Sequence, residues 1–327
     1  MKQILLLVGI AMMMSCKGNQ TTQEQTYTQQ SPDFNVDSAY TYIAEQCQFG
    51  PRIMNSAAHD SCGDYIARKF ESFGATVYNQ YADGRLYDGT PIKMRNIVAS
   101  FDEANPVRLL ICAHWDARPW ADNDPNPDNY YTPIDGANDG GSGVGVMMEI
   151  ARQIQLKAPA VGVDFICFDA EDCGVPNWEN SFDDTSSSWC LGSQYWAGTH
   201  HIEGYRARFG ILLDMVGGSN CNFQKEAYSV LYAGQFVDKV WAKAQNLGFG
   251  EYFSSEKCGA VTDDHVQVNQ SGIPCIDIIS HDKNGYGFCA THHTVDDNLA
   301  QNTKTIINRY KNNIPFFSKN ITTTILI

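Results

Sequence analysis

Several short apolar segments of this chain are followed by acidic residues or histidines. Segments 107–112, 161–168 and 209–213 are rich in apolar residues and indicate buried strands of a parallel sheet, because strands covered on both faces have this composition. Polar residues that follow such segments, or lie in the loops that begin there, are His114, Asp116, Asp139, Glu171, Asp172, Asp214, Asp263, Asp264 and His293.

The position of these polar residues predicts a metal site. In open α/β sheets, ligands gather beyond the carboxyl ends of the strands. Imidazole and carboxylate groups collected at one such edge are what a zinc ion requires. One residue of this kind would mean little, but their recurrence at successive strand ends makes a metal site the leading hypothesis.

The alternation of strands and helices predicts a single α/β domain. Apolar runs and helical spacing predict strands over 75–81, 94–101, 107–113, 161–168, 208–214, 227–232 and 274–279, and helices around 40–44 and over 57–73, 143–156, 193–201, 236–246, 263–270 and 299–319. This order implies a central twisted sheet, mixed but mostly parallel, with helices on both faces. We expect one catalytic domain over 35–327, because no internal repeat and no second-domain linker is evident.

The N-terminal segment is typical of a processing signal. Lys2 is followed by a short apolar stretch, and Ser15-Cys16 closes it. We expect a lipoprotein signal peptide over 1–15, lipidation of Cys16 and a flexible tether over 16–34, which would anchor an exported protein in the bacterial envelope (periplasm or outer membrane). The alternative is an ordinary cleaved signal with an incidental cysteine.

Charge and cysteine usage exclude some classes of protein. A net charge of −14 and a pI near 4.9 argue against a nucleic-acid partner, which requires a basic footprint. The chain has no CxxC pair, so a thiolate zinc site is not expected. Cys173 and Cys190 flank a long loop and are candidates for a disulfide in an exported protein.

The polar residues form five motifs in a fixed order along the chain. Together they resemble the zinc-dependent glutaminyl cyclases, which share a fold with the co-catalytic zinc aminopeptidases. The resemblance runs from about Asp37 to the predicted C-terminal helix. Its motifs are His114-x-Asp116 after a strand, Asp139 in a Gly-rich turn, the pair Glu171-Asp172, Asp214 after a strand, and His293 before Thr294-x-Asp296-Asp297.

The resemblance implies a metal set and a general acid/base. Asp139, Asp172 and His293 would bind one zinc ion per chain and leave its fourth position open, as catalytic zinc sites do. Many members of the family have Glu where Asp172 stands, and the shorter arm would shift the metal slightly. Glu171 would act as the general acid/base beside that metal.

Asp263 separates the two enzyme classes that share this framework. In the aminopeptidases, the residues equivalent to His114 and Asp214 bind a second zinc. The cyclases instead have a second carboxylate facing the equivalent of Asp214, and Asp263 in Asp263-Asp264-His265 matches that pattern. Two such carboxylates would share a proton and would hydrogen-bond the reacting groups. The alternative is that Asp263 only caps the following helix.

Aromatic residues near the motifs are candidates for the walls of a substrate pocket. By resemblance to the cyclases, Trp178 and Phe288 would contact the substrate side chain, although a lone aromatic residue is also common in a core. Vertebrate-like cyclases have Trp before the ligand histidine, where this chain has His292. Asp296 and Asp297 would cap the last helix or orient His293.

The resemblance therefore predicts cyclisation of N-terminal glutamine on peptides and proteins to pyroglutamate, with release of ammonia. The first alternative is a di-zinc aminopeptidase, in which His114 and Asp214 would bind a second metal. Asp116 would either join that metal or support its ligands. A remoter alternative is a non-enzymatic binding protein on the same fold. Metal stoichiometry separates the two enzymes, because the cyclase would hold one zinc and the peptidase two.

Overall fold

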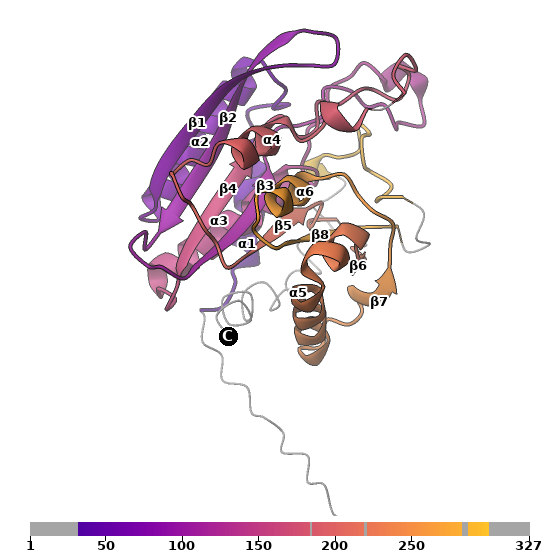
Figure 1. Cartoon of the computed structure of the whole chain (residues 1–327). Coiled ribbons are helices and arrows are strands. Elements are labelled where there is room, and N and C mark those ends of the chain that lie inside the picture. Colours follow the sequence, from indigo (N-terminus) through magenta and orange to yellow (C-terminus); the bar gives the residue numbers. More distant parts are fainter. Residues whose placement is uncertain (1–31, 184, 219–220, 283–286, 301–327) are drawn as a thin grey trace, which may run out of the picture.

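The computed structural model describes residues 32–183, 185–218, 221–282 and 287–300 (Figure 1). The predicted signal peptide, Cys16 and most of the predicted tether lie outside these residues. The end of the tether differs from the prediction, because Phe34 is buried against the hydrophobic core. Among the residues described, no helix is long and apolar enough to cross a bilayer.

A six-stranded mixed sheet forms the centre of the molecule. Its order is β1-β2-β4-β3-β5-β8. β1 pairs antiparallel with β2, and β2 pairs antiparallel with β4, whereas the pairings of β4 with β3, β3 with β5 and β5 with β8 are parallel. The predicted mostly parallel sheet is confirmed. The strands are β1 (Thr76–Arg85), β2 (Pro91–Phe101), β3 (Arg108–His114), β4 (Gly162–Phe168), β5 (Phe209–Asp214) and β8 (Cys275–Ile279).

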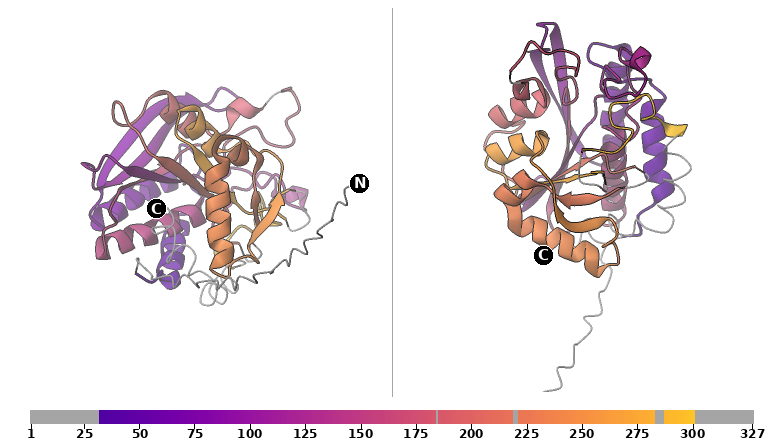
Figure 2. Two further views of the ribbon diagram at one scale, coloured as in Figure 1. Left: turned by 60° about the horizontal axis from the view of Figure 1, so that its bottom comes forward. Right: turned by 90° about the vertical axis from the view of Figure 1, so that its right-hand side faces the viewer.

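Helices cover both faces of this sheet, as predicted (Figure 2). α1 (Val36–Cys47), α2 (Ala57–Ser72) and α3 (Gly141–Leu156) pack on one face, and side chains of α5 (Ala227–Asn246) join the same core. α4 (Leu191–Gly198) and α6 (Asp264–Gln270) cover the other face. Alternation along β3 explains both layers, because Leu109 and Ile111 enter one core while Leu110 and Cys112 enter the other.

One predicted strand is wrong, and two short strands were missed. Residues 227–232, predicted as a strand, form the start of α5, because the Glu226 carboxylate accepts hydrogen bonds from the backbone N–H groups of Tyr228 and Ser229 and caps a helix there. The strand lies just before, as β6 (Phe223–Lys225), and pairs in parallel with β7 (Phe253–Lys257). The predicted helix over 299–319 lies almost wholly outside the described residues.

The sheet topology gathers several loops at one edge. The carboxyl ends of β3, β4 and β5 lie together because these strands are parallel, and two successive antiparallel pairings bring the end of β1 to the same edge. The long loops after β3 and β4 begin there and include the short helices η1 (Pro127–Asn129) and η2 (Ser186–Ser188). Figure 1 shows both loops at the upper right.

Candidate active site

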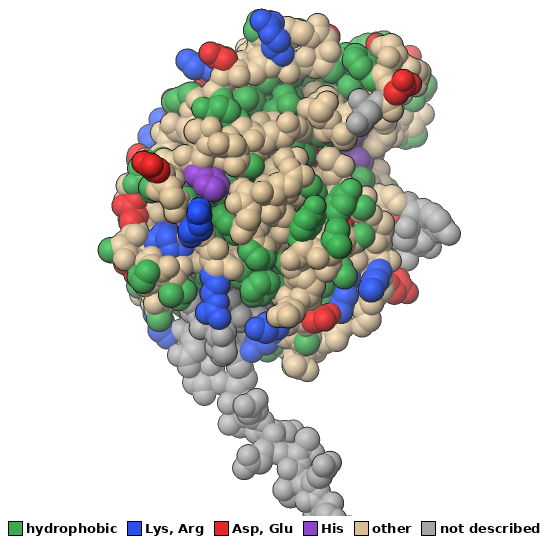
Figure 3. Space-filling view, viewed as in Figure 1, with side chains coloured by type: hydrophobic (Ala, Val, Ile, Leu, Met, Phe, Trp, Pro, Cys, Tyr) green, Lys and Arg blue, Asp and Glu red, His purple; other side chains and the backbone are tan. Residues whose placement is uncertain are grey.

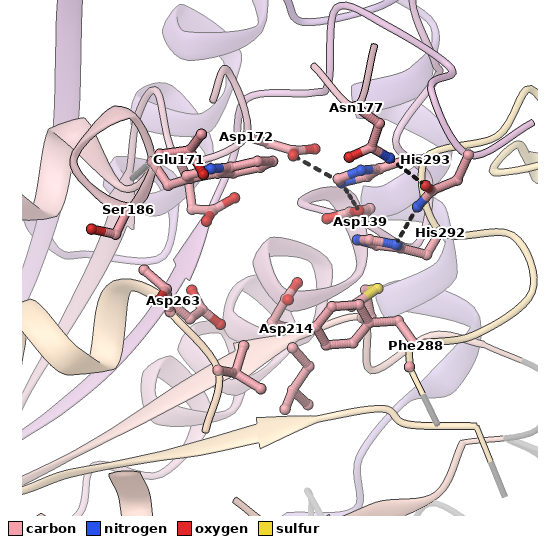
Figure 4. Close-up of a pocket in the computed structure, with 18 of the residues that line it drawn as sticks. Asp139, Glu171, Asp172, Asn177, Ser186, Asp214, Asp263, Phe288, His292 and His293 are labelled. Carbon is pink, nitrogen blue, oxygen red and sulfur yellow. Dashed lines mark hydrogen bonds and ion pairs between the residues drawn. The ribbon is translucent and has the colours of Figure 1, made fainter. Parts of the chain in front are cut away.

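A cavity of about 720 Å³ lies at this edge of the sheet (Figure 4). Its volume falls within the range of small-molecule and cofactor sites. The structure places all the predicted metal ligands and all the predicted catalytic carboxylates in its wall, together with two predicted substrate contacts. These residues are Asp139, Glu171, Asp172, Asp214, Asp263, Phe288, His292 and His293.

The predicted metal ligands meet around the His293 imidazole. Its Nε2 lies 2.9 Å from Asp172 Oδ1 and 3.7 Å from Asp139 Oδ2. Asp172 Oδ2 is buried and has no hydrogen-bond partner within the described part of the chain. Burial disfavours a charged imidazole, yet Asp172 and Asp122 raise the pKa of His293 to about 9. The space between these three side chains therefore attracts a cation, and two carboxylates with one imidazole are a ligand set that fits a zinc ion.

Two further carboxylates hold the backbone that carries these ligands. Asp116 accepts hydrogen bonds from the N–H groups of Glu171 and Asp172, at 3.0 and 3.1 Å. Asp297 accepts from the N–H groups of Asn138 and Asp139, at 2.8 and 3.0 Å. Asp297 was predicted to cap the last helix or orient His293, and the structure places its carboxylate on the Asp139 turn instead. Such supports outside the ligand set fix the ligand positions.

The residues of a second metal site also lie together. His114 Nε2 is 3.0 Å from Asp139 Oδ1 and 3.3 Å from Asp214 Oδ1. The potential ligand atoms of these three residues all lie within 4.8 Å of one another. The side-chain arrangement that the aminopeptidase alternative requires is therefore present in this chain.

Asp263 both caps a helix and faces the cavity. Its Oδ1 accepts the backbone N–H of Asp264 at the start of α6, at 2.6 Å. Its Oδ2 is buried without a hydrogen-bond partner among the described residues. Burial raises the pKa of Asp214 to about 7, and the charges of Asp139 and Asp263 act in the same direction, against His114. An Asp214 that is often protonated near neutral pH is a poor ligand for a second cation.

Glu171 lies against a cysteine. The Cys190 Sγ is 3.2 Å from Glu171 Oε1, and Glu171 Oε2 is 4.0 Å from His114 Nδ1. The thiols of Cys173 and Cys190 are both free, so these two candidates do not form a disulfide. Burial, together with the charges of Asp172 and Asp263, raises the pKa of Glu171 well above its ordinary value despite the nearby His114. A raised pKa suits a carboxyl group that exchanges protons near neutral pH.

Phe288 and His292 form one wall of the cavity. The ring of His292 lies 3.6 Å from that of His293 and 4.6 Å from that of Phe288, between centroids. Its Nδ1 is 3.0 Å from the Asn123 side-chain amide. Burial and the neighbouring His293 hold the pKa of His292 well below its ordinary value. A neutral His292 therefore stands where vertebrate-like cyclases have tryptophan.

Trp189 lines the cavity, and Trp178 does not. The Trp189 ring lies nearly parallel to that of His293, with centroids 6.1 Å apart. Trp178, which was predicted for this role, packs outside the cavity against Tyr131, 4.8 Å away. The sequence signal for Trp189 that was missed is Gly174. A Cβ at this position would lie 2.2 Å from the Trp189 ring, so only glycine leaves room for the ring there.

These observations define the class of the protein. A mixed, mostly parallel sheet with aspartate, glutamate and histidine side chains at the carboxyl ends of its strands has the architecture of the zinc aminopeptidase-like enzymes. The chain belongs to peptidase family M28, whose family model matches residues 96–317.

Solved structures of this family are similar over most of the chain. The glutaminyl cyclase of Bacteroides thetaiotaomicron is 46% identical, with a TM-score of 0.84 over 89% of this chain and 99% of that one. The glutaminyl cyclase of Tannerella forsythia is also 46% identical, with a TM-score of 0.82 over 88% and 99%. A leucine aminopeptidase precursor from Bacteroides thetaiotaomicron is 46% identical as well, with a TM-score of 0.83 over 90% and 99%.

Matches to curated relatives are shorter. The aligned regions span 31% and 38% of the length of two of these relatives. These short matches are consistent with membership of the family and do not define the reaction of the whole protein.

Proposed function

We propose that this protein is a zinc-dependent glutaminyl cyclase, which converts the N-terminal glutamine of peptides and proteins to pyroglutamate and releases ammonia. The observation that carries the proposal is the second carboxylate, Asp263, in the cavity wall with Asp214. The 46% identity to two glutaminyl cyclases supports the same reaction.

One zinc ion per chain would be held by Asp139, Asp172 and His293. When bound there, it would supply a Lewis acid for the γ-carboxamide carbonyl of the substrate glutamine. Asp116 and Asp297 would keep the ligands in place through the backbone hydrogen bonds described above.

Glu171 moves the proton in this reaction. It takes a proton from the substrate α-amine, whose nitrogen forms a bond to the carbonyl carbon of the γ-carboxamide. It then delivers that proton to the amide nitrogen as the bond from the carbonyl carbon to this nitrogen breaks, and ammonia leaves. Asp214 and Asp263 would hydrogen-bond the reacting nitrogen atoms. Trp189 and Phe288 would orient the side chain and exclude water.

A di-zinc aminopeptidase is the second candidate. The closeness of His114, Asp139 and Asp214 favours it, as does the 46% identity to a leucine aminopeptidase precursor. Against it stands Asp263, whose charge helps to keep Asp214 protonated and so weakens the second site. A binding protein without activity is not supported, because every ligand and Glu171 are present.

Export and a lipid anchor complete the proposal. They are supported by the sequence around Ser15 and Cys16, which would place the catalytic domain in the bacterial envelope at the end of a membrane tether.

The reaction is tested by incubating the mature protein with a glutamine-initiated peptide and measuring its mass. We expect the loss of one ammonia, abolished by a chelator and restored by zinc. Glu171→Gln should keep its zinc and lower kcat by roughly 10²- to 10⁴-fold. Metal analysis should give one zinc per chain. Release of free glutamine, with two zinc ions bound, would establish the aminopeptidase instead.

A further inference from the structure

Six aromatic side chains outside the cavity form one connected surface, which we call the aromatic rim. Trp178 is at its centre, with ring centroids 6.0 Å from Trp120, 6.0 Å from Tyr130 and 4.8 Å from Tyr131. Tyr87 extends this surface, because its ring centroid lies 5.8 Å from that of Trp120 and 6.1 Å from that of Phe182. The members are Tyr87, Trp120, Tyr130, Tyr131, Trp178 and Phe182.

The aromatic rim is built from three loops at the edge of the sheet that carries the cavity. Tyr87 lies in the turn between β1 and β2, and the others lie in the loops after β3 and β4. Packing of these loops on one another explains the half-buried rings, but not all of the surface. Tyr131 remains 74% exposed and Phe182 43% exposed. Exposed apolar area next to a site is typical of a binding surface.

A stack of planar groups connects the rim to the cavity. The Arg118 guanidinium lies 5.3 Å from the ring of Trp120 and 4.6 Å from the ring of Trp189, which lines the cavity. Arg118 is fully buried, and Asp122 accepts two hydrogen bonds from it, at 2.9 and 2.6 Å. The stack is therefore fixed in position.

The loop that carries Trp178 and Phe182 also contributes to the cavity wall. Asn177 and Asp183, the residues just before Trp178 and just after Phe182, both line the cavity. The Asn177 amide donates to Asn123 Oδ1 at 2.6 Å, and Figure 4 shows Asn177 beside His293. Residues of one short segment thus face the cavity at both ends and the rim between them.

The charge of these loops favours some peptides over others. Residues 86–90, 115–140 and 169–190 contain no lysine, and the buried Arg118 is their single arginine. Exposed acidic residues, including Asp88, Asp128 and Asp183, lie in the same loops. Figure 3 shows hydrophobic and acidic side chains on the loops at the upper right. An acidic peptide would be repelled there, whereas apolar or basic ones would not.

We propose that the aromatic rim binds the residues that follow the N-terminal glutamine of a peptide substrate, and that it selects apolar and aromatic side chains over acidic ones. This inference rests on the proposed glutaminyl cyclase function. A peptide whose first residue occupies the cavity must leave through its mouth, and both end residues of the segment 177–183 line that cavity. Stacking on exposed rings then adds affinity without any change at the reacting atoms.

The test compares a minimal substrate with extended ones. The kcat/KM for glutamine amide measures the reaction without any contact to the rim. The values for Gln-Phe-Phe amide and Gln-Asp-Asp amide add the effect of the residues that would contact the rim. The wild-type protein should have the highest kcat/KM for Gln-Phe-Phe amide and the lowest for Gln-Asp-Asp amide. In Trp178→Ala and Tyr131→Ala, the ratio of kcat/KM for Gln-Phe-Phe amide to that for glutamine amide should fall about 3- to 10-fold, mainly through KM. Tyr232→Ala, an exposed tyrosine on α5, should leave this ratio as it is.

The outcomes separate this inference from the proposed function. Cyclisation of glutamine amide with an unchanged ratio in both rim variants would overturn the inference and leave the function intact. Equal losses on both substrates in the exposed Tyr131→Ala variant would also overturn it, because they would indicate a disturbed loop. Absence of cyclisation of glutamine amide by the wild-type protein would remove the function itself.

Discussion

At the scale of single residues, the Glu171 carboxylate is positioned by a thiol. Cys190 is fully buried and has a left-handed backbone with φ of 57°. Its N–H donates to the Glu171 carbonyl at 3.0 Å, and its Sγ lies 3.2 Å from Glu171 Oε1. Burial and the charge of Glu171 raise the pKa of this thiol well above its ordinary value, so it remains a donor.

Replacement of Cys190 should therefore affect turnover more than binding. Cys190→Ala removes the donor to Glu171, and we expect kcat to fall about 10-fold with little change in KM, since a hydrogen bond to a charged group is lost. Cys190→Ser keeps a donor and should retain most of the activity. If the thiol served only as packing, Ser would be worse than Ala, because a buried hydroxyl costs free energy. Equal zinc content in both variants is the control.

Some residues of the site could be predicted from the sequence, and others could not. His114 and Asp214 are the last residues of β3 and β5, and the Glu171-Asp172 pair lies shortly after β4, so their positions follow from the pattern of the strands. Trp178 and Trp189 lie within one long loop, and the path of that loop decides which of them enters the cavity. The resemblance to the cyclases favoured Trp178, whereas packing over Gly174 selects Trp189.

At the scale of elements, the close approach of α3 to the sheet positions Asp139. A Cβ on Gly143 would lie 2.3 Å from the Leu213 carbonyl oxygen on β5 and 2.7 Å from Ala113 Cβ on β3. The helix therefore touches the strands through its backbone. Asp139 stands two residues before α3 begins at Gly141, so displacement of this helix would move a metal ligand.

Gly143→Ala should lower both stability and zinc affinity. The added methyl group overlaps backbone atoms, and overpacking of this kind costs about 1–3 kcal/mol in the free energy of unfolding. Gly234→Ala is the matched control, because Gly234 also lies within a helix but has no atom within 4 Å of its added Cβ. The control should be neutral or stabilising by up to about 1 kcal/mol. Urea denaturation and zinc titration of both variants measure this, and equal effects would contradict the argument.

The prediction of secondary structure failed where the residue types favoured a strand and a capping side chain favoured a helix. The segment that starts α5 is rich in aromatic and branched residues, which favour strands. Glu226 overrides that preference by capping the backbone, and Ala233 has a non-helical conformation within the helix. The short strand β7 was missed because its residues after Phe253 are polar and mostly exposed.

At the scale of the whole molecule, one buried carboxylate connects parts of the chain that are distant in sequence. Glu226 accepts hydrogen bonds from the N–H groups of Tyr228 and Ser229 in α5, from Val261 in the loop before α6, and from His265 Nε2 within α6. Burial opposes its ionisation, yet His265 and these amides lower the pKa of Glu226 to about 2. The folded state therefore holds this group as a carboxylate.

This shift predicts how stability depends on pH. The folded pKa lies below the ordinary value of 4.5, so the contribution of Glu226 is complete above about pH 4.5 and is lost as pH falls towards 2. Relative to Glu226→Gln, the wild-type free energy of unfolding should be larger by roughly 3 kcal/mol at pH 7 and by roughly half of that near pH 3. Urea denaturation at both pH values measures the gap, with the exposed Glu251→Gln as the control. A gap of equal size at both pH values would mean that the charge of Glu226 does not hold these elements together.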